Sequence, residues 1–307
     1  MEFEVEFKIL NFLKEAVRQN KLNHAYIFYG LDENFKKSIC ENFSKLILCK
    51  TKKENCKVCS SCVKFLSGNH PDFFEIGTEE KLKQSFTVEN VRELIKRCFV
   101  KPNESLFKIF LLKNVDTLNL NASNALLKIL EQPPKNVIFL LTATNKNNVL
   151  KTIFSRCVSF FVPPVNVSEC LKYLCSLNVG LNEKELKNIA NLTQGDLGLA
   201  KFLTTEEGNN VLTISNELID SFLKKDELIF CSILQKNEKN LDLILKLLNC
   251  FLLKLLVKFE EINEFKTNEI ERFYEILNFL ESTILNLKKN CNVSITLSKL
   301  CCEIFKN

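Results

Sequence analysis

Proline and glycine are missing from the last third of this chain of 307 residues. The six prolines all occur by Pro164, and the seven glycines all occur by Gly208. Turns and strand ends usually need these residues, whereas helix interiors reject them. Apolar residues also recur at three- and four-residue steps between Leu241 and Leu255. Together these features predict that residues 208–307 form an all-helical domain.

Long apolar runs and a strong charge of one sign are also lacking. No stretch reaches the roughly 18 apolar residues that would indicate a membrane-spanning helix. The first residues, Met1 to Glu4, lack the apolar segment of a secretory signal peptide. The net charge of +5 is too small to indicate nucleic-acid binding by itself. We therefore expect a cytoplasmic globular protein of two or three domains, with no membrane partner.

The first 163 residues have a different pattern, in which short apolar runs alternate with helical segments. None of the runs alternates with polar residues, as expected for strands buried on both faces. Helical periodicity is present at Lys36–Leu48 and at Asn121–Glu131. This alternation predicts an α/β fold, a parallel sheet with helices on both sides. The predicted strands are Ala25–Tyr29, Phe73–Ile76, Ile109–Leu112, Val137–Thr142 and Val158–Val162.

Four of the 14 cysteines are clustered at Cys49, Cys56, Cys59 and Cys62. In a cytosolic chain such a cluster is more typical of a metal site than of disulfides. Four thiolates at these spacings suit a tetrahedral Zn²⁺ ion, and a site closed in this way leaves no open position for catalysis. The alternative is a set of free thiols in a loop. We predict structural zinc in a module at residues 49–70, in which His70 forms hydrogen bonds and is not a fifth ligand.

The loop after the first predicted strand has the position of a phosphate-binding loop but not its residues. In the pattern G-x-x-x-x-G-K-[ST], Gly30 and Lys36 stand at the first glycine and the lysine. Phe35 replaces the second glycine, whose small size lets backbone N–H groups close around phosphates. Lys37 replaces the hydroxyl residue that holds Mg²⁺. We expect a degenerate loop that forms an ordinary strand-to-helix connection.

The acidic pair that an ATPase places after a later strand is also absent. Lys113 and Asn114 follow the predicted strand Ile109–Leu112, where Asp and Glu would hold Mg²⁺ and orient water. Asp116 comes two residues too late. Two losses at one site predict an ATPase-like fold without a functional ATP site.

Four motifs in order along residues 23–157 resemble those of one family. They are Asn23-His24-Ala25-Tyr26, His70-Pro71-Asp72, the block from Ser123 to Pro134 that reads SNALLKILEQPP, and Ser155-Arg156-Cys157. Gln132 departs from the family's second glutamate in the block. On these motifs the chain resembles the AAA+ clamp-loader family of bacterial DNA polymerase III. The degenerate phosphate loop is similar to that of the family's delta-prime branch, whereas the tau and gamma branches keep theirs.

The resemblance implies an organisation and a function. It implies an AAA+-like α/β domain at 1–163 with the inserted zinc module, a small helical lid domain at 164–207, and a helical collar at 208–307 for oligomerisation. It implies that Arg156 is an arginine finger, inserted in trans into a neighbouring subunit's ATP site. Expected partners are the gamma/tau and delta subunits, the sliding clamp, and primed DNA within the complex.

Two other functions remain open from the sequence. The chain could be a weakly active ATPase motor, gamma- or tau-like, of the same complex. It could instead be a zinc-containing nucleic-acid-binding module with an inert α/β body. If the chain instead resembles the delta-prime branch in function, we expect no ATPase activity of its own, although it would be a subunit of a DNA-directed DNA polymerase.

Overall fold

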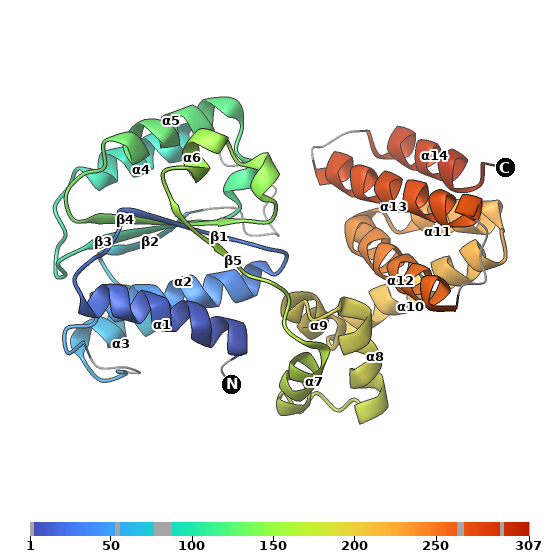
Figure 1. Ribbon diagram of the computed structural model, residues 1–307, viewed down its shortest axis with the longest axis horizontal. Coiled ribbons are helices and arrows are strands. Elements are labelled where there is room, and N and C mark those ends of the chain that lie inside the picture. The colour runs from blue at the N-terminus through green and yellow to red at the C-terminus, as the bar shows by residue number, and fades with distance from the viewer. Residues whose placement is uncertain (1–2, 53–55, 77–87, 263–266, 289–291, 307) are drawn as a thin grey trace. The chain divides into compact units, whose positions relative to one another are not determined.

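The chain forms two compact units, Met1–Val165 and Asn166–Asn307. Figure 1 shows both units in a computed structural model, which describes residues 3–52, 56–76, 88–262, 267–288 and 292–306. The finer division of the second unit at residue 207 stays a prediction. No helix within these described ranges combines the length and the apolar character needed to cross a bilayer.

The first unit is built on a five-stranded parallel sheet with the order β2-β3-β4-β1-β5. All the predicted strands are present, and each end lies within one residue of its predicted place. Every position of β3 and β4 is buried, as expected for central strands covered on both faces. The strands are β1 (Ala25–Tyr29), β2 (Phe73–Ile76), β3 (Lys108–Leu112), β4 (Val137–Ala143) and β5 (Val158–Phe161).

Helices cover both faces of this sheet (Figure 1). On one side lie α1 (Glu4–Arg18), α2 (Glu33–Leu48) and α3 (Ser60–Leu66), and on the other lie α4 (Val88–Cys98), α5 (Leu120–Glu131) and α6 (Lys151–Phe154). Short 3-10 turns occupy Val115–Thr117 and Lys146–Asn148. Leu94, Leu126 and Ile153 bring the second set of helices into one core with Phe110 and Phe139 of the sheet. The α/β architecture predicted from the sequence is confirmed.

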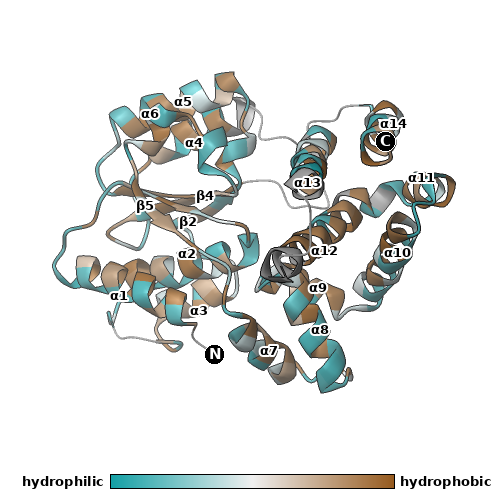
Figure 2. Ribbon diagram, turned by 45° about the vertical axis from the view of Figure 1, so that its right-hand side comes forward, coloured by the Kyte–Doolittle hydropathy of each residue, from teal (hydrophilic) through white to brown (hydrophobic). Residues whose placement is uncertain are grey.

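All the regular secondary structure in the described residues of the second unit is helical. Its longest helices are α12 and α13, and the stretch with predicted periodicity lies in α12. Ile244, Leu245, Leu248 and Leu252 of α12 are fully buried. Figure 2 shows α12 as largely hydrophobic, which is typical of a helix at the centre of a bundle. The helices are α7 (Val167–Ser176), α8 (Glu183–Thr193), α9 (Leu197–Leu203), α10 (Glu206–Leu223), α11 (Glu227–Lys236), α12 (Leu241–Ile262), α13 (Thr267–Lys288) and α14 (Val293–Ile304).

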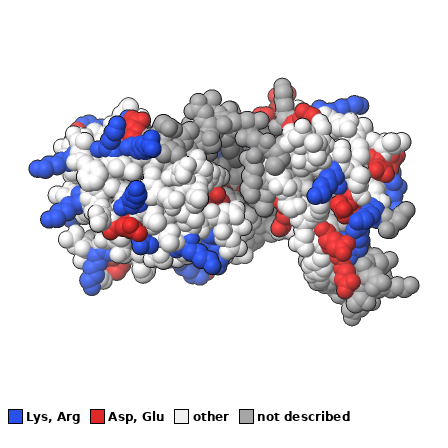
Figure 3. Space-filling model, turned by 90° about the horizontal axis from the view of Figure 1, so that it is seen from above, with Lys and Arg blue, Asp and Glu red and all other residues white. Residues whose placement is uncertain are grey.

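Charged side chains are mixed in sign on the surface. Among the described residues on the face drawn in Figure 3, Lys and Arg are interspersed with Asp and Glu. This distribution agrees with the small net charge of +5. A function that depends on a wide field of one sign is not favoured by this face.

Candidate functional site

The lysine of the degenerate phosphate loop points into the protein. Lys36 lies in the first turns of α2 and its side chain is fully buried. Its Nζ donates hydrogen bonds to Gly30 O and Ala143 O, each 2.7 Å long. The same nitrogen is 2.9 Å from Glu33 Oε2 in an ion pair. Two of the three N–H groups of the ammonium are thus hydrogen-bonded to backbone oxygens, and the carboxylate of Glu33 balances its charge.

The other loop residues have structural roles. A Cβ on Gly30 would lie 2.0 Å from Val162 O, so only glycine fits against the chain that follows β5. Asp32 begins α2 as its N-cap and accepts a 3.0 Å hydrogen bond from Phe35 N. The Phe35 ring packs edge-on against Phe3 with 5.3 Å between centroids. Phe35 therefore does more than block a phosphate, because it joins the first residues of the chain to α2.

A network of charged side chains joins Lys37, Lys113 and Glu75. Glu75 at the end of β2 is 2.9 Å from Lys37 Nζ and 2.7 Å from Lys113 Nζ. Burial alone would raise the pKa of Glu75, but hydrogen bonds and charges from Lys113 and Lys37 outweigh burial and lower it. The two lysines that replace the hydroxyl residue and the acidic residue are thus bridged by one carboxylate.

The polar residues at the ends of β3 and β4 are also bonded to one another. Thr142 Oγ1 donates a 2.6 Å hydrogen bond to Glu33 Oε1 and accepts one from Asn114 N. Asp116 Oδ2 accepts hydrogen bonds from the backbone N–H groups of Thr144 and Asn145, each 3.0 Å long. Asp116, which the sequence placed past the strand end, fixes the loop after β4.

The four clustered cysteines lie together in space. Their sulfur atoms are all within 4.8 Å of one another. Cys49 follows the end of α2, and Cys59 is the N-cap of α3, where its sulfur accepts from Cys62 N. Hydrogen bonding, chiefly to Thr51, lowers the pKa of Cys56 to about 6, whereas burial raises that of Cys62. Four thiolates this close repel one another unless a cation neutralises them, so the set fits Zn²⁺.

His70 connects the cysteine module to the sheet. Its Nδ1 accepts a hydrogen bond from Asp72 N at 3.1 Å, so Nε2 carries the proton and donates to Ser61 Oγ at 2.9 Å. Ser61 in turn donates to Leu48 O. The Asp72 carboxylate accepts from three successive backbone N–H groups, at 103 to 105. The predicted hydrogen-bonding role of His70 is confirmed, and the bonds clamp α3 between α2 and the start of β2.

Arg156 is partly exposed and follows α6. Its Nη1 donates to Thr152 O at 2.8 Å, and its Nη2 is 2.8 Å from Glu131 Oε1. The side chain keeps 36% of its surface exposed. The guanidinium is therefore held at two nitrogens on a side chain that is partly exposed.

The sequence of residues 5–166 matches the family described as "DNA polymerase III, delta subunit". This match spans more than half of the chain. The chain belongs to this family. The resemblance to clamp-loader subunits is thereby confirmed at the level of the family. The motifs that carried it, at residues 23–157, lie within the matched region.

Individual relatives come from more than one branch of clamp-loader subunits. The gamma subunit of Buchnera aphidicola subsp. Baizongia pistaciae is 29% identical over 78% of this chain and 66% of its own length. The delta-prime subunit of Yersinia pestis is 33% identical over 50% of this chain and 45% of its own length. The chain thus spans from under half to about two thirds of these relatives. A gamma-subunit-related protein of Thermotoga maritima has the same fold, with a TM-score of 0.54, 17% identity and coverage of 97% and 98% of the two chains.

Three partners of these residues were not found from the sequence. Glu33, Glu75 and Glu131 each bind a lysine or arginine of the predicted site. No motif points to Glu33 or Glu75. Glu131 lies inside the family block SNALLKILEQPP, but nothing in that block indicates its contact with Arg156.

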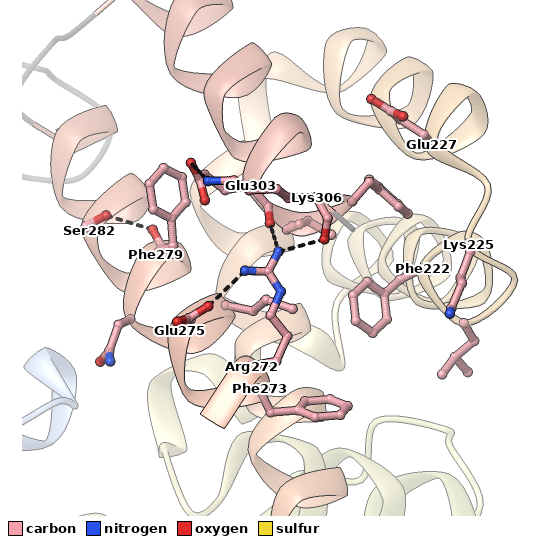
Figure 4. Close-up of a pocket in the computed structure, with 15 residues that line it drawn as sticks. Phe222, Lys225, Glu227, Arg272, Phe273, Glu275, Phe279, Ser282, Glu303 and Lys306 are labelled. Carbon is pink, nitrogen blue, oxygen red and sulfur yellow. Dashed lines mark hydrogen bonds and ion pairs between the residues drawn. The ribbon is translucent and has the colours of Figure 1, made fainter. Parts of the chain in front are cut away.

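A groove in the second unit was also not predicted. It is lined by residues of α10, α13 and α14, and Figure 4 shows Arg272 at its centre. Arg272 forms an ion pair with Glu275 at 2.9 Å and donates to the backbone oxygens of Glu303 and Lys306 at the end of α14. Its guanidinium is therefore used to hold the C-terminal helix, where a cation is favoured by the helix dipole.

Proposed function

We propose that this chain is a delta-prime-type subunit of the DNA polymerase III clamp loader. In this role it hydrolyses no ATP itself, supplies Arg156 in trans to the ATP site of a neighbouring subunit, and helps to load the sliding clamp onto primed DNA. Its partners are the gamma/tau and delta subunits, which the helices of residues 208–307 join in a collar.

The observation that carries the proposal is the state of Lys36. In a working phosphate loop this lysine reaches the β- and γ-phosphates. Here its ammonium is bonded to Gly30 O and Ala143 O and is paired with Glu33. A phosphate could take the lysine only by leaving the buried carbonyl of Gly30 unpaired, at a cost of about 1–3 kcal/mol, and by removing one of the two donors of Ala143 O and the cation of Glu33.

The Mg²⁺ side of the site supports the same conclusion. Lys37 and Lys113 put two positive charges where a divalent cation would sit, and Glu75 is already shared between them. The positive charges of these two lysines oppose the binding of a cation beside them. The place of the catalytic acid pair therefore repels the metal that phosphoryl transfer requires.

Arg156 supplies the remaining function. A guanidinium placed beside the γ-phosphate of a neighbouring subunit offsets the charge that develops during hydrolysis. Two of its five N–H groups contact Glu131 and the backbone, so three are left for phosphate oxygens. The exposure of the side chain is what a group that acts on another chain requires.

A second candidate is a gamma- or tau-like ATPase motor with weak activity. It is favoured by one observation, the similarity of 29% over 78% of the chain to a gamma subunit. The two candidates differ in nucleotide binding. A motor subunit binds ATP and Mg²⁺, whereas the proposed subunit does not.

Calorimetric titration of the purified chain with ATP and Mg²⁺, together with its steady-state ATP hydrolysis, distinguishes these candidates. We expect neither binding at physiological nucleotide concentrations nor turnover above background. Saturable binding with turnover in contaminant-free protein would establish the motor subunit instead. An isolated gamma subunit measured in parallel is the positive control.

The cysteine module has a structural part in this proposal. Cys49, Cys56, Cys59 and Cys62 would hold one Zn²⁺ with no open coordination position, so the ion supplies folding energy to residues 49–70 and takes no part in ATP chemistry. The network of His70 and Asp72 would transmit this local order to the start of β2.

A further inference from the structure

The contact between Glu131 and Arg156 joins two elements whose backbones are firmly placed. Glu131 is the last residue of α5, and its neighbour Leu130 is only 1% exposed. Ile153 of α6, three residues before Arg156, is also 1% exposed and belongs to the same core as Leu130. The two side chains therefore start from fixed points and meet at 2.8 Å.

The guanidinium is held at two of its nitrogens. Glu131 takes Nη2, and the carbonyl of Thr152 takes Nη1. Two contacts at different nitrogens fix both the position and the plane of the fork, which one contact would not do. The side chain as a whole keeps 36% of its surface exposed.

We infer that Glu131 is a positioning residue for Arg156, which orders the guanidinium before it meets the phosphate of a neighbouring subunit. The inference rests on the proposed trans role of Arg156. A long arginine side chain that is free in solution must be immobilised when it binds, and this cost lowers the rate. Glu131 reduces that cost in advance and touches no phosphate itself. Because both side chains are partly exposed, solvent screens its charge from the phosphate.

The test is a double-mutant cycle in clamp-loader complexes reconstituted from this chain and its P-loop partners. Clamp- and DNA-stimulated ATP hydrolysis is measured for wild type, Glu131→Ala, Arg156→Ala and the double variant, with assembly checked by size. We expect Glu131→Ala to lower the part of kcat that depends on Arg156 by about two- to tenfold, with KM for ATP unchanged. In the Arg156→Ala background, Glu131→Ala should have no further effect.

Two further variants separate positioning from stability. Glu131→Gln keeps an oxygen that accepts from Nη2, so it should restore most of the rate. Glu93→Ala removes the partner of Arg97 in another exposed pair, at 2.6 Å on α4, and should not change the rate.

Each other outcome has a distinct meaning. If Arg156→Ala lowers the rate but Glu131→Ala leaves it unchanged or raises it, the positioning role is wrong and the proposed function survives. If Glu131→Ala slows the complex equally with and without Arg156, Glu131 does not act through the arginine. If Arg156→Ala itself has no effect in an assembled complex, both the proposed function and this inference are overturned.

Discussion

Replacing Lys36 by methionine tests whether its ammonium holds the structure together. Met fills much of the same volume, so the change removes the charge and leaves a small cavity. It leaves Gly30 O without its donor, at about 1–3 kcal/mol for a buried acceptor, and removes one of the two donors of Ala143 O, which still accepts from Gly30 N. Glu33 also loses its cation but is 26% exposed, so water replaces part of that contact. We expect the free energy of unfolding of the first unit to fall by about 2–4 kcal/mol.

Native-state hydrogen exchange of the β1 and β4 amides in increasing urea reports this quantity for the first unit alone. Lys37→Met is the matched control, because Lys37 is next in the sequence but 33% exposed, and its loss should cost about 1 kcal/mol or less. Equal protection in the two variants would refute the internal role of Lys36. The lysine would then be available for phosphate, as in a working loop.

The zinc module, Gly30 and His70 can each be tested in the purified chain. Metal analysis of the purified chain should find about one zinc per molecule, and Cys59→Ser should remove it and disorder residues 49–70 while the β-sheet amides keep their exchange protection. Gly30→Ala should lower the urea midpoint of the first unit more than an exposed Gly68→Ala does, because an alanine is strained by the positive φ at both positions but at Gly30 its Cβ would also lie 2.0 Å from Val162 O, whereas nothing lies within 4 Å of a Cβ at Gly68. Burial lowers the pKa of His70 below its ordinary 6.5, so the stability that its neutral form provides should be complete above about pH 6.5 and be lost as the pH falls below that value. Urea unfolding at pH 7.5 and 5.5 measures this loss. An equal fall in the free energy of unfolding between the two pH values in His70→Gln would contradict the role of His70.

The sheet was predictable from the sequence because its central strands β3 and β4 are buried on both faces, although the outer strands β2 and β5 are only partly buried. The run Val137–Thr142 is apolar at nearly every position, and such runs have few alternatives once turns bound them. The predicted start of the first helix after β1, α2, was less exact. The helix begins at Glu33 and not at Lys36, because Asp32 caps it. A cap is set by one side-chain hydrogen bond, which apolar periodicity does not reveal.

The site was predictable in its positions but not in its contacts. The sequence identified Lys36, Lys37 and Lys113 as departures from an ATPase, and the structure brings them to one edge of the sheet. It could not identify their partners, because Glu75 lies 38 residues from Lys37 along the chain. Pairings between distant side chains depend on the register of the strands, which no local pattern specifies.

The central claim is that Arg156 acts on the ATP site of a neighbouring subunit. Its most direct test compares clamp- and DNA-stimulated ATP hydrolysis by fully assembled complexes with Arg156 or Arg156→Ala. Fingers of this kind contribute about 10³–10⁵ in rate in small GTPases. A complex with several ATP sites would lose the arginine finger of only one site, so we expect a smaller overall decrease in the rate of ATP hydrolysis. Arg156→Lys should restore the rate incompletely, because an ammonium lacks the planar fork. Normal assembly with reduced hydrolysis is the predicted result, and an undiminished rate in the assembled Arg156→Ala complex would contradict it.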